Sequence, residues 1–301
     1  MDIPPVLCNK ILRVFGPQGQ KWLGQLPQLY RRCVEKWHLS NCRLSPVISY
    51  NLVCFAKSPQ FGPVVLKIGM PVRELYTEIE ALTLYRGRQI CNIYAADTEL
   101  GAFLVEPLVP GYDLTTLNSS SERIVVAAEL IPRLPVAAGS SSELPTFAQL
   151  LNAACIRFRS ENGGEARMRQ FTEHAEFLFA ELNQRPQVLL HGDMNHWNIL
   201  RAGERWKAID PKGMLGPGCL EAGRFITNEL NMVDASARLD CLREAVTALG
   251  AGFDENPKTI ALCTFIDKVI STCWFFEEVV DRDRSKHVTQ CELLWDFYCG
   301  L

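Results

Sequence analysis

The sequence has no surplus of basic residues. Its 31 Lys and Arg are outnumbered by 34 Asp and Glu, and the formal net charge is -3. Because such a chain has no basic field to attract a nucleic-acid backbone, we expect no nucleic-acid partner. The small acidic surplus is compatible with a cationic substrate, and nothing in the composition predicts an oligomeric state.

Long apolar runs and a basic, apolar leader are also missing. The longest apolar runs, such as residues 64–68, suit a buried strand or helix segment, and none reaches the length of a membrane span. The first ten residues hold an acid and two prolines where a signal peptide would have a basic start and an apolar stretch. We therefore expect a cytoplasmic protein without a membrane partner.

Paired cysteines are absent, although the chain has 12 cysteines. They are scattered singly, with no CxxC pair and no two at the interval of a metal knuckle. This spacing argues against a zinc site. In the reducing compartment expected for the chain, it favours free thiols that are mostly buried.

The first third of the chain predicts a small sheet with helices beside it. Residues 17–37 carry apolar side chains every three or four positions, which predicts an amphipathic helix with a break or kink at Pro27. Three strand-like runs separated by turn residues then predict an antiparallel meander. These runs are 38–45, 51–58 and 63–69. A helix over 72–87 and two strand-like runs on either side of 97–101 complete this region.

The character of the sequence changes after Glu106. Prolines and glycines interrupt the pattern from Pro107 onward, and most of the chain beyond this point has the pattern of helices. At 301 residues, with 48% hydrophobic and 22% charged residues, the chain is large enough for two lobes. We therefore expect a sheet-rich lobe over 1–106 and a mainly helical lobe over 107–301.

The most informative segment is residues 188–213, VLLHGDMNHWNILRAGERWKAIDPKG. An apolar run ends in His-Gly-Asp at Asp193, Asn198 follows five residues later, and Asp210 follows after twelve more. Two short strands joined by a turn at 202–204 would place Asn198 opposite Asp210 where the hairpin opens. Asp193 would lie nearby on the incoming loop, so that three oxygen-bearing side chains converge.

Three such side chains suit phosphoryl transfer. Asp193 would accept the proton of an attacking hydroxyl, while Asn198 and Asp210 would hold Mg²⁺ against nucleotide phosphates. Mg²⁺ prefers oxygen ligands, so an amide and a carboxylate suit it better than His or Cys. Each residue alone could be an ordinary loop-capping side chain. The combination of HGDxxxxN with a strand ending in IDP is far more specific.

The segments HGDMNHWNIL and WKAIDPKG resemble the aminoglycoside phosphotransferases. More narrowly, they resemble the aminoglycoside/hydroxyurea antibiotic-resistance kinases, the streptomycin 6-kinase-like branch. Further similar pieces are VVLKIG, TEIEALTLYRG, LVEPLVPG and EAGRFITN, so the resemblance spans roughly residues 20–230. It implies a protein-kinase-like two-lobed α+β fold, with an antiparallel-sheet N-lobe for the nucleotide and a helical C-lobe for catalysis and substrate. It also implies a kinase that uses ATP, or alternatively GTP, and Mg²⁺ to phosphorylate a small-molecule hydroxyl.

The resemblance assigns a role to Lys67, which lies mid-strand among apolar residues. By its position alone, a strand lysine is more often an exposed edge residue. The resemblance implies that Lys67 contacts the nucleotide phosphates and is held by Glu78 of the following helix. Glu74 and Glu80 compete for that pairing, but Glu80 points about 200° away from Glu78 around a helix.

Other nucleotide-binding residues are implied by position. Tyr50 and Asn51 stand where the family has its nucleotide loop, although the chain lacks a glycine-rich loop there. The carbonyl of Glu106 and the N–H of Leu108 would pair with the edge of the base, since Pro107 has no N–H to donate. As single residues, Tyr50 and Asn51 are equally compatible with a structural turn.

The acceptor hydroxyl has to lie within hydrogen-bond reach of Asp193. The family builds the acceptor pocket from its helical lobe. The candidate residues there are Glu221, Arg224, Trp274, Glu277 and Glu278. Carboxylates would attract a polycationic antibiotic, which could stack on Trp274. Alternatively, Glu277 and Glu278 form a solvated helix face and Trp274 belongs to the core.

Three residues near the motif have alternative roles. His196 and Trp197 could touch substrate or pack within the loop, and Lys212 could contact a phosphate, contact the acceptor or reach solvent. A two-metal phosphoesterase is a rival interpretation, but after His196 the chain offers only His287 as a further histidine ligand. A non-catalytic nucleotide-binding regulator, or a kinase of an unrelated hydroxylated metabolite, would keep the same fold.

Overall fold

The computed structural model describes residues 3–46, 50–139, 142–161, 165–278 and 284–301. The chain forms two compact units, unit 1 from Met1 to Gly111 and unit 2 from Tyr112 to Leu301. The division falls a few residues after the boundary at 106 that the sequence predicts.

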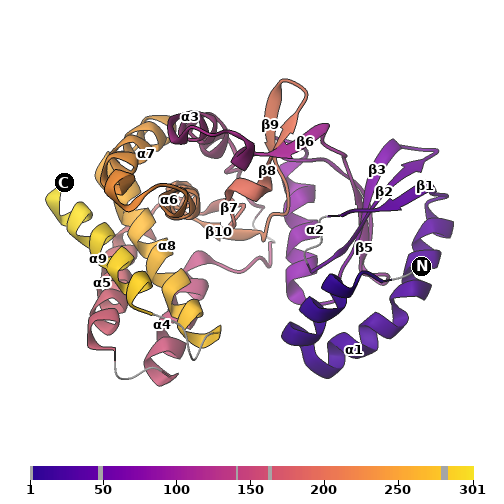
Figure 1. The fold of residues 1–301 in the computed structure, drawn as a ribbon, viewed down its shortest axis with the longest axis horizontal. Helices are drawn as coiled ribbons and strands as arrows, with labels where there is room; N and C mark the ends of the chain where they lie inside the picture. Colours follow the sequence, from indigo (N-terminus) through magenta and orange to yellow (C-terminus); the bar gives the residue numbers. More distant parts are fainter. Residues whose placement is uncertain (1–2, 47–49, 140–141, 162–164, 279–283) are drawn as a thin grey trace. The chain divides into compact units, whose positions relative to one another are not determined.

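Unit 1 is a five-stranded antiparallel sheet with two helices (Figure 1). The strands are β1 (Ser40–Leu44), β2 (Leu52–Ser58), β3 (Gly62–Ile68), β4 (Ile93–Asp97) and β5 (Ala102–Val105). The helices are α1 (Pro5–Lys36) and α2 (Arg73–Tyr85). The predicted meander of the first three strands is confirmed by the pairing of β1 with β2 and of β2 with β3. The last two strands lie in the sheet in the reverse of their order in the sequence. β5 pairs with β3, and β4 lies at the edge.

The side chains of β3 alternate between two faces of the sheet. Leu66 and Ile68 belong to a buried cluster with Trp22 and Leu26 of α1. Because successive strand residues point to opposite faces, Lys67 between them lies on the other face of the sheet. Apolar packing against α1 therefore determines which face is left for the lysine.

The first helix differs from its prediction. It begins at Pro5 rather than near residue 17, and its one non-helical residue is Gly16, with φ 50° and ψ -129°. Pro27, where the sequence predicts a break, lies inside the helix. Glycine adopts a positive φ readily, so the chain turns at Gly16 and then resumes a helix at Pro17.

Unit 2 is mainly helical, as predicted. Its helices are α3 (Ser120–Leu130), α4 (Phe147–Glu161), α5 (Ala166–Leu182), α6 (Glu221–Met232), α7 (Arg238–Phe253), α8 (Pro257–Glu278) and α9 (Ser285–Gly300). Its short strands are β7 (Val188–Leu190), β8 (Ile199–Ala202), β9 (Arg205–Ala208) and β10 (Met214–Gly216), with β6 (Pro110–Asp113) at the join of the units. Short 3₁₀ turns include η3 (His196–Asn198) and η4 (Gly218–Leu220).

The α8 helix is the centre of this unit, and α4, α5, α6, α7 and α9 all pack against it. The expectation that no stretch reaches the length of a membrane span is wrong for Pro257–Phe276, which is long and apolar enough to cross a membrane. However, 78% of its most apolar window is buried inside the protein. A core helix of a globular unit has this composition for the same reason that a membrane span does, because it is surrounded by apolar groups. The 12 cysteines are all free thiols, as expected.

Candidate active site

Lys67 and Glu78 form a buried ion pair in unit 1. Lys67 lies between β2 and β5 in the sheet, and only 4% of the residue is exposed. Its Nζ atom is 2.5 Å from Oε1 of Glu78 on α2 and 5.3 Å from the centroid of the Phe103 ring. The predicted pairing with Glu78 is therefore present, and the lysine is not an exposed edge residue. Glu78 thus holds the ammonium group of Lys67 at a defined place on the sheet.

The backbone at Glu106 is fixed by Asn92. The Glu106 N–H donates to the Asn92 carbonyl at 2.8 Å, and the Asn92 backbone N–H and Nδ2 donate to Oε2 of Glu106 at 3.0 and 2.9 Å. The carboxylate is thus used within the protein. The groups predicted to meet the base are the carbonyl of Glu106 and the N–H of the half-buried Leu108.

Tyr50 and Asn51 lie in different surroundings. Tyr50 is 45% exposed, and Nζ of Lys10 is 5.9 Å from its ring centroid. Asn51 packs against Gly69, where a Cβ atom would come within 2.5 Å of its Oδ1. Asn51 therefore lies beside the end of the strand that carries the lysine. The predicted turn also includes residues 47–49, which lie outside the described part of the chain.

In unit 2 the His-Gly-Asp loop follows β7. Gly192 has a φ of +78°, and a Cβ atom there would lie 2.7 Å from Cε of Met214, so the turn requires glycine. His191 is completely buried, and its Nε2 lies 2.7 Å from the Ile209 carbonyl. Nε2 must therefore carry the proton, which leaves Nδ1 to accept the Asp193 N–H at 3.2 Å. Burial lowers the pKa of His191, in keeping with a neutral ring.

Glu221 holds this loop from the first residue of α6. Its Oε2 accepts the His191 N–H at 2.8 Å, and its Oε1 accepts the Gly192 N–H at 2.9 Å. The residue is 3% exposed, and burial raises the pKa of its carboxyl to about 7 against the effect of these two hydrogen bonds. Both oxygens of this buried carboxylate accept loop N–H groups, which disfavours the predicted contact of Glu221 with the acceptor. The carboxylate holds the backbone of the loop in place.

Asn198 and Asp210 lie at the open end of the β8–β9 hairpin. Ile199 pairs with Ala208 and the Ile209 N–H donates to the Asn198 carbonyl at 2.9 Å, so Ile209 faces Asn198 and Asp210 is the next residue. The predicted register is thus wrong by one residue, because the strands are joined by a two-residue turn after Ala202. Asp210 adopts a φ of +59° at this point.

The residues at this position fit a magnesium ion. Asn198 donates from Nδ2 to the Asp193 carbonyl at 2.9 Å. The Oδ1 atom of Asn198 takes no part in this hydrogen bond and can serve as a metal ligand. Asn198 and Asp210 would then hold the ion with two protein oxygens. Within the described ranges, no cluster of three or more His, Cys, Asp or Glu could hold a metal. Two protein ligands are enough for Mg²⁺, which keeps several waters and binds substrate phosphates.

The family model of the aminoglycoside/hydroxyurea antibiotic resistance kinases matches residues 36–279. The chain belongs to this family. Streptomycin 6-kinases from Streptomyces glaucescens and Streptomyces griseus are each 26% identical to it, with alignments that cover 72% of this chain and of theirs. Hydroxyurea phosphotransferase from Kitasatospora aureofaciens is 28% identical, over 82% of this chain and 74% of that protein. The chain is therefore a small-molecule kinase that phosphorylates a hydroxyl group.

Solved structures share its fold. A choline kinase from Streptococcus pneumoniae superposes with a TM-score of 0.63 at 13% identity, covering 92% of this kinase and 100% of that chain. Aminoglycoside phosphotransferase APH(4)-Ia, solved with ADP and hygromycin B, gives a TM-score of 0.61 at 13% identity over 89% and 97% of the two chains. These likenesses confirm the predicted protein-kinase-like α+β fold.

A buried triad braces the catalytic loop of the kinase from two helices. Arg123 of α3 donates two hydrogen bonds to Glu229 of α6, at 2.9 and 2.6 Å, and a third to the Leu117 carbonyl at 2.6 Å. Nε2 of His196 lies 2.6 Å from the same carboxylate, and the His196 ring stacks on Phe225. His196 is completely buried, so it packs the loop and does not reach a substrate.

Neither Arg123 nor Glu229 was among the predicted site residues. Burial alone would raise the pKa of Glu229, but hydrogen bonds from His196 and Arg123 lower it to about 2. The sequence signal is a charged residue among apolar ones in each of these two segments, and such a signal does not identify the partner. Trp197, the neighbour of His196, is 56% exposed and stays available to a ligand.

The remaining predicted acceptor residues lie on α8. Trp274 is half-buried, with Nζ of Lys212 5.7 Å and Cζ of Arg224 5.8 Å from its ring centroid. Its proposed stacking on a polycation is therefore disfavoured, because two cations of the kinase already flank the ring. Glu277 and Glu278 end α8, and their side chains lie outside the described part of the structure.

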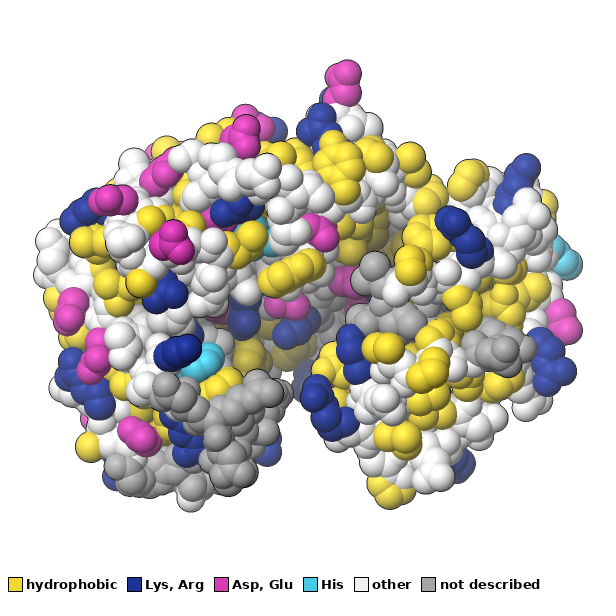
Figure 2. All heavy atoms as spheres, in the orientation of Figure 1, with side chains coloured by type: hydrophobic (Ala, Val, Ile, Leu, Met, Phe, Trp, Pro, Cys, Tyr) yellow, Lys and Arg dark blue, Asp and Glu magenta, His cyan; other side chains and the backbone are white. Residues whose placement is uncertain are grey.

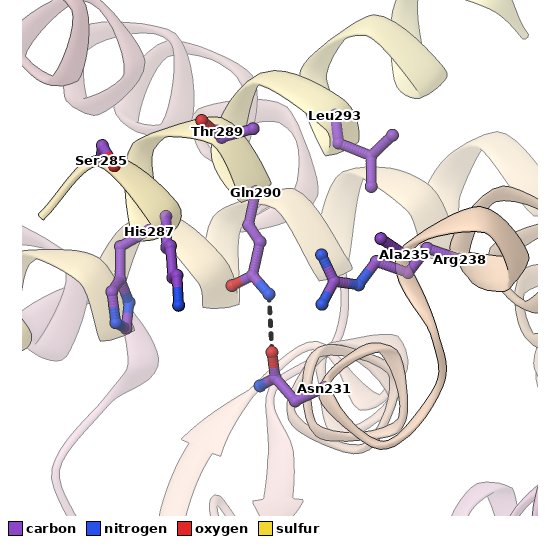
Figure 3. A pocket seen from close by; sticks show the side chains of 9 residues that line it. Asn231, Ala235, Arg238, Ser285, His287, Thr289, Gln290 and Leu293 are labelled. Carbon is purple, nitrogen blue, oxygen red and sulfur yellow. Dashed lines mark hydrogen bonds between the residues drawn. The ribbon is translucent and has the colours of Figure 1, made fainter. Parts of the chain in front are cut away.

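A cavity of about 660 Å³ lies away from these residues (Figure 3). It is lined by residues of α9, the end of α6 and the start of α7, with Arg238 and His287 among them. Gln290 donates across it to Oδ1 of Asn231 at 2.6 Å. None of the residues predicted for catalysis or for acceptor binding lines this cavity.

Proposed function

We propose that this kinase transfers the γ-phosphate of ATP to a small-molecule hydroxyl, with Mg²⁺ bound by Asn198 and Asp210. The observation that carries the proposal is the rigid Asp193 loop, whose backbone is held by His191 and Glu221 and to which the Asn198 amide is hydrogen-bonded. This arrangement supports Asp193 as a base held in one orientation. Mg²⁺, when bound, would neutralise charge on the nucleotide phosphates.

The proposed reaction exchanges one bond for another at phosphorus. The bond between the γ-phosphorus and its bridging oxygen breaks, and the acceptor oxygen forms the new bond. The proton of the acceptor hydroxyl passes to the Asp193 carboxylate, which is half-buried and within a loop that Glu221 orients. Lys67, held by Glu78, would bind the nucleotide phosphates, and the backbone at Glu106 and Leu108 would bind the base.

Streptomycin and hydroxyurea, the substrates in the names of the relatives, are the first acceptors to test. A kinase of another hydroxylated metabolite remains the second candidate, because the catalytic residues do not specify the acceptor. The kinase is proposed to act in the cytoplasm without a nucleic-acid partner. On the face drawn in Figure 2, acidic and basic side chains are interspersed over unit 2, as expected for a surface that binds no polyanion.

The test is a coupled assay with purified kinase, ATP or GTP, and Mg²⁺. The acceptors are streptomycin, other aminoglycosides, hydroxyurea and a panel of neutral, cationic and anionic hydroxylated metabolites. Turnover of any acceptor that depends on Asp193 supports the proposal. Tight nucleotide binding without turnover of any acceptor would instead favour a non-catalytic regulator.

Replacing Glu78 by glutamine is expected to lower kcat/KM for ATP by about 10–100-fold. The loss corresponds to one charge-assisted hydrogen bond, worth about 1.5–3 kcal/mol, that positions the buried Lys67. Steady-state kinetics at saturating acceptor would measure it. Glu74→Gln, an exposed change on the same helix, is the control and should leave kcat/KM unaltered. An equal effect of both changes would contradict a specific role for the pair.

Replacing Glu221 by glutamine is expected to lower kcat by about 100-fold with little change in KM for ATP. The amide has one acceptor oxygen for two loop N–H groups, so the loop that carries Asp193 shifts and the base is misplaced. Comparing kcat and KM separates this loss from a loss of binding. Glu244→Gln on the exposed face of α7 is the control. An unchanged kcat in Glu221→Gln would show that the loop needs no brace.

A further inference from the structure

Three side chains from three elements of unit 2 meet beside the catalytic loop. They are Lys212, which follows β9 and Asp210, Arg224 of α6 and Trp274 of α8. The Lys212 N–H donates to the His191 carbonyl at 2.8 Å, so the backbone of this lysine is attached to the loop that carries Asp193. The lysine and arginine lie 5.7 and 5.8 Å from the tryptophan ring centroid. We call these three residues the tryptophan patch.

Positive charge exceeds negative charge among the side chains that the structure describes around Trp274. Nε of Arg224 lies 3.1 Å from Oδ1 of Asp267, without hydrogen-bond geometry, and Oδ2 of that carboxylate accepts the Thr227 hydroxyl at 2.9 Å. The carboxylate of Asp267, the one that pairs with Arg224 among the described residues, is therefore shared and largely buried. Lys212 is exposed and forms no ion pair with the described residues. Among the described side chains around the ring, two cations thus face the Asp267 carboxylate, and the guanidinium edge beyond Nε has no described protein acceptor.

The position and charge of the patch bear on the acceptor. A molecule whose hydroxyl reaches Asp193 lies close to the residues attached to the same loop. A polycation placed there would meet Lys212 and Arg224 with like charge, whereas an oxyacid group could accept hydrogen bonds from both. Trp274 offers a flat, half-buried face that would cover the apolar part of such a molecule.

We propose that the tryptophan patch binds an oxyacid group, a carboxylate or a phosphate, carried by the hydroxylated acceptor. This inference rests on the proposed function for the place of the acceptor, but the charge of the patch does not depend on it. It distinguishes this kinase from one built for a polycationic aminoglycoside. Within the proposed chemistry, Lys212 and Arg224 are specificity residues, and Asp193 remains the base.

The charge of the patch can be measured without knowing the acceptor. Iodide and caesium quench tryptophan fluorescence by collision. The fluorescence of Trp274 is obtained as the difference between the emission of the wild type and that of Trp274→Phe, and its quenching is followed for each ion. Each quenching constant is divided by that of N-acetyltryptophanamide. At low ionic strength the normalised iodide constant should exceed the caesium constant by about threefold or more, as one net charge about 6 Å away implies, and salt should reduce the ratio.

Variants test which residues carry the effect. Lys212→Gln with Arg224→Gln should bring the normalised ratio close to one. Arg243→Gln, which removes one positive charge at an exposed residue of α7 paired with Asp240, should leave it as in the wild type. Equal quenching of Trp274 by the two ions in the wild type would overturn the proposal.

Acceptor kinetics then test the ligand. Gluconate, glucose and glucosamine are matched acceptors that differ in charge, and they join the panel together with phosphorylated alcohols. For anionic acceptors the double variant should raise the acceptor KM about tenfold, with the KM for ATP unchanged. A kinase that phosphorylates only polycations, or a double variant that raises only the KM for ATP, would overturn the proposal. A high iodide ratio without turnover of any acceptor would support the anion patch and count against the proposed function instead.

Discussion

Replacing Asp193 by asparagine is expected to lower kcat by about 10²–10⁴-fold, the range typical of a lost general base. Asparagine has nearly the same shape and keeps the backbone N–H that donates to Nδ1 of His191 at 3.2 Å. The loop geometry should therefore persist, including the Asn198 hydrogen bond to the backbone carbonyl of residue 193. Only the capacity to take the proton of the acceptor hydroxyl is lost.

The measurement is single-turnover and steady-state kinetics at saturating ATP and acceptor. Nucleotide affinity, determined by calorimetry, should change by less than about threefold, because in this scheme Asp193 does not hold the metal or the phosphates. Asp234→Asn is the matched control, since this aspartate is exposed and lies elsewhere in unit 2. Turnover by Asp193→Asn at the wild-type rate would remove Asp193 as the base and require another residue.

Replacing Glu229 by glutamine is expected to reduce the free energy of unfolding by about 3 kcal/mol. The change leaves Arg123 buried beside a neutral group, and removing one partner of a buried ion pair typically has an effect of this size. It also weakens the hydrogen bond to His196, so kcat should fall with stability. Urea unfolding followed by circular dichroism would measure the free energy.

The control for this change is a second bidentate pair in the same unit. Arg159 donates to Glu176 at 2.7 and 3.0 Å, but both side chains are 31% exposed. Solvent screens this pair, so Glu176→Gln should change the free energy of unfolding by at most about 1 kcal/mol. Equal losses in the two variants would mean that burial does not govern the energy of the triad.

The pH dependence of the triad has a definite sign. The pKa of Glu229 is about 2 in the folded protein and lies near its ordinary value of 4.5 when the chain is unfolded. Between these values the unfolded chain binds more protons, so stability falls as the pH is lowered from about 4.5 towards 2. Above about 4.5 the contribution is complete. In Glu229→Gln this component of the acid dependence should be missing.

Much of unit 1 could be predicted from its sequence. The strands over 51–58 and 63–69 are bounded by turn residues, and their pairing follows from the short connection between them. The place of β5 between β3 and β4 could not be predicted in this way. Adjacent strands in the sequence usually pair, but which edge a later strand joins depends on the apolar face that it has to cover.

The residues predicted for catalysis were easier to recognise in the sequence than the residues that hold them in place. Asp193, Asn198 and Asp210 are recognisable because their spacing is local and their residue types are those that phosphoryl transfer requires. Glu221 looked like a free carboxylate, and only the fold shows that both of its oxygens accept loop N–H groups. A sequence does not show whether the first residue of a helix faces solvent or a loop.

By itself, the sequence determined the kind of protein, a small-molecule kinase without a basic surplus, and it located the short segment that is predicted to carry the base and the metal ligands. The tertiary structure alone decided which charges are paired. Arg123 and Glu229 are 106 positions apart, and Lys212, Arg224 and Trp274 come from separate elements. Local patterns report on neighbours within a few residues, whereas burial and long-range packing determine which charges compensate one another and which remain to bind a ligand.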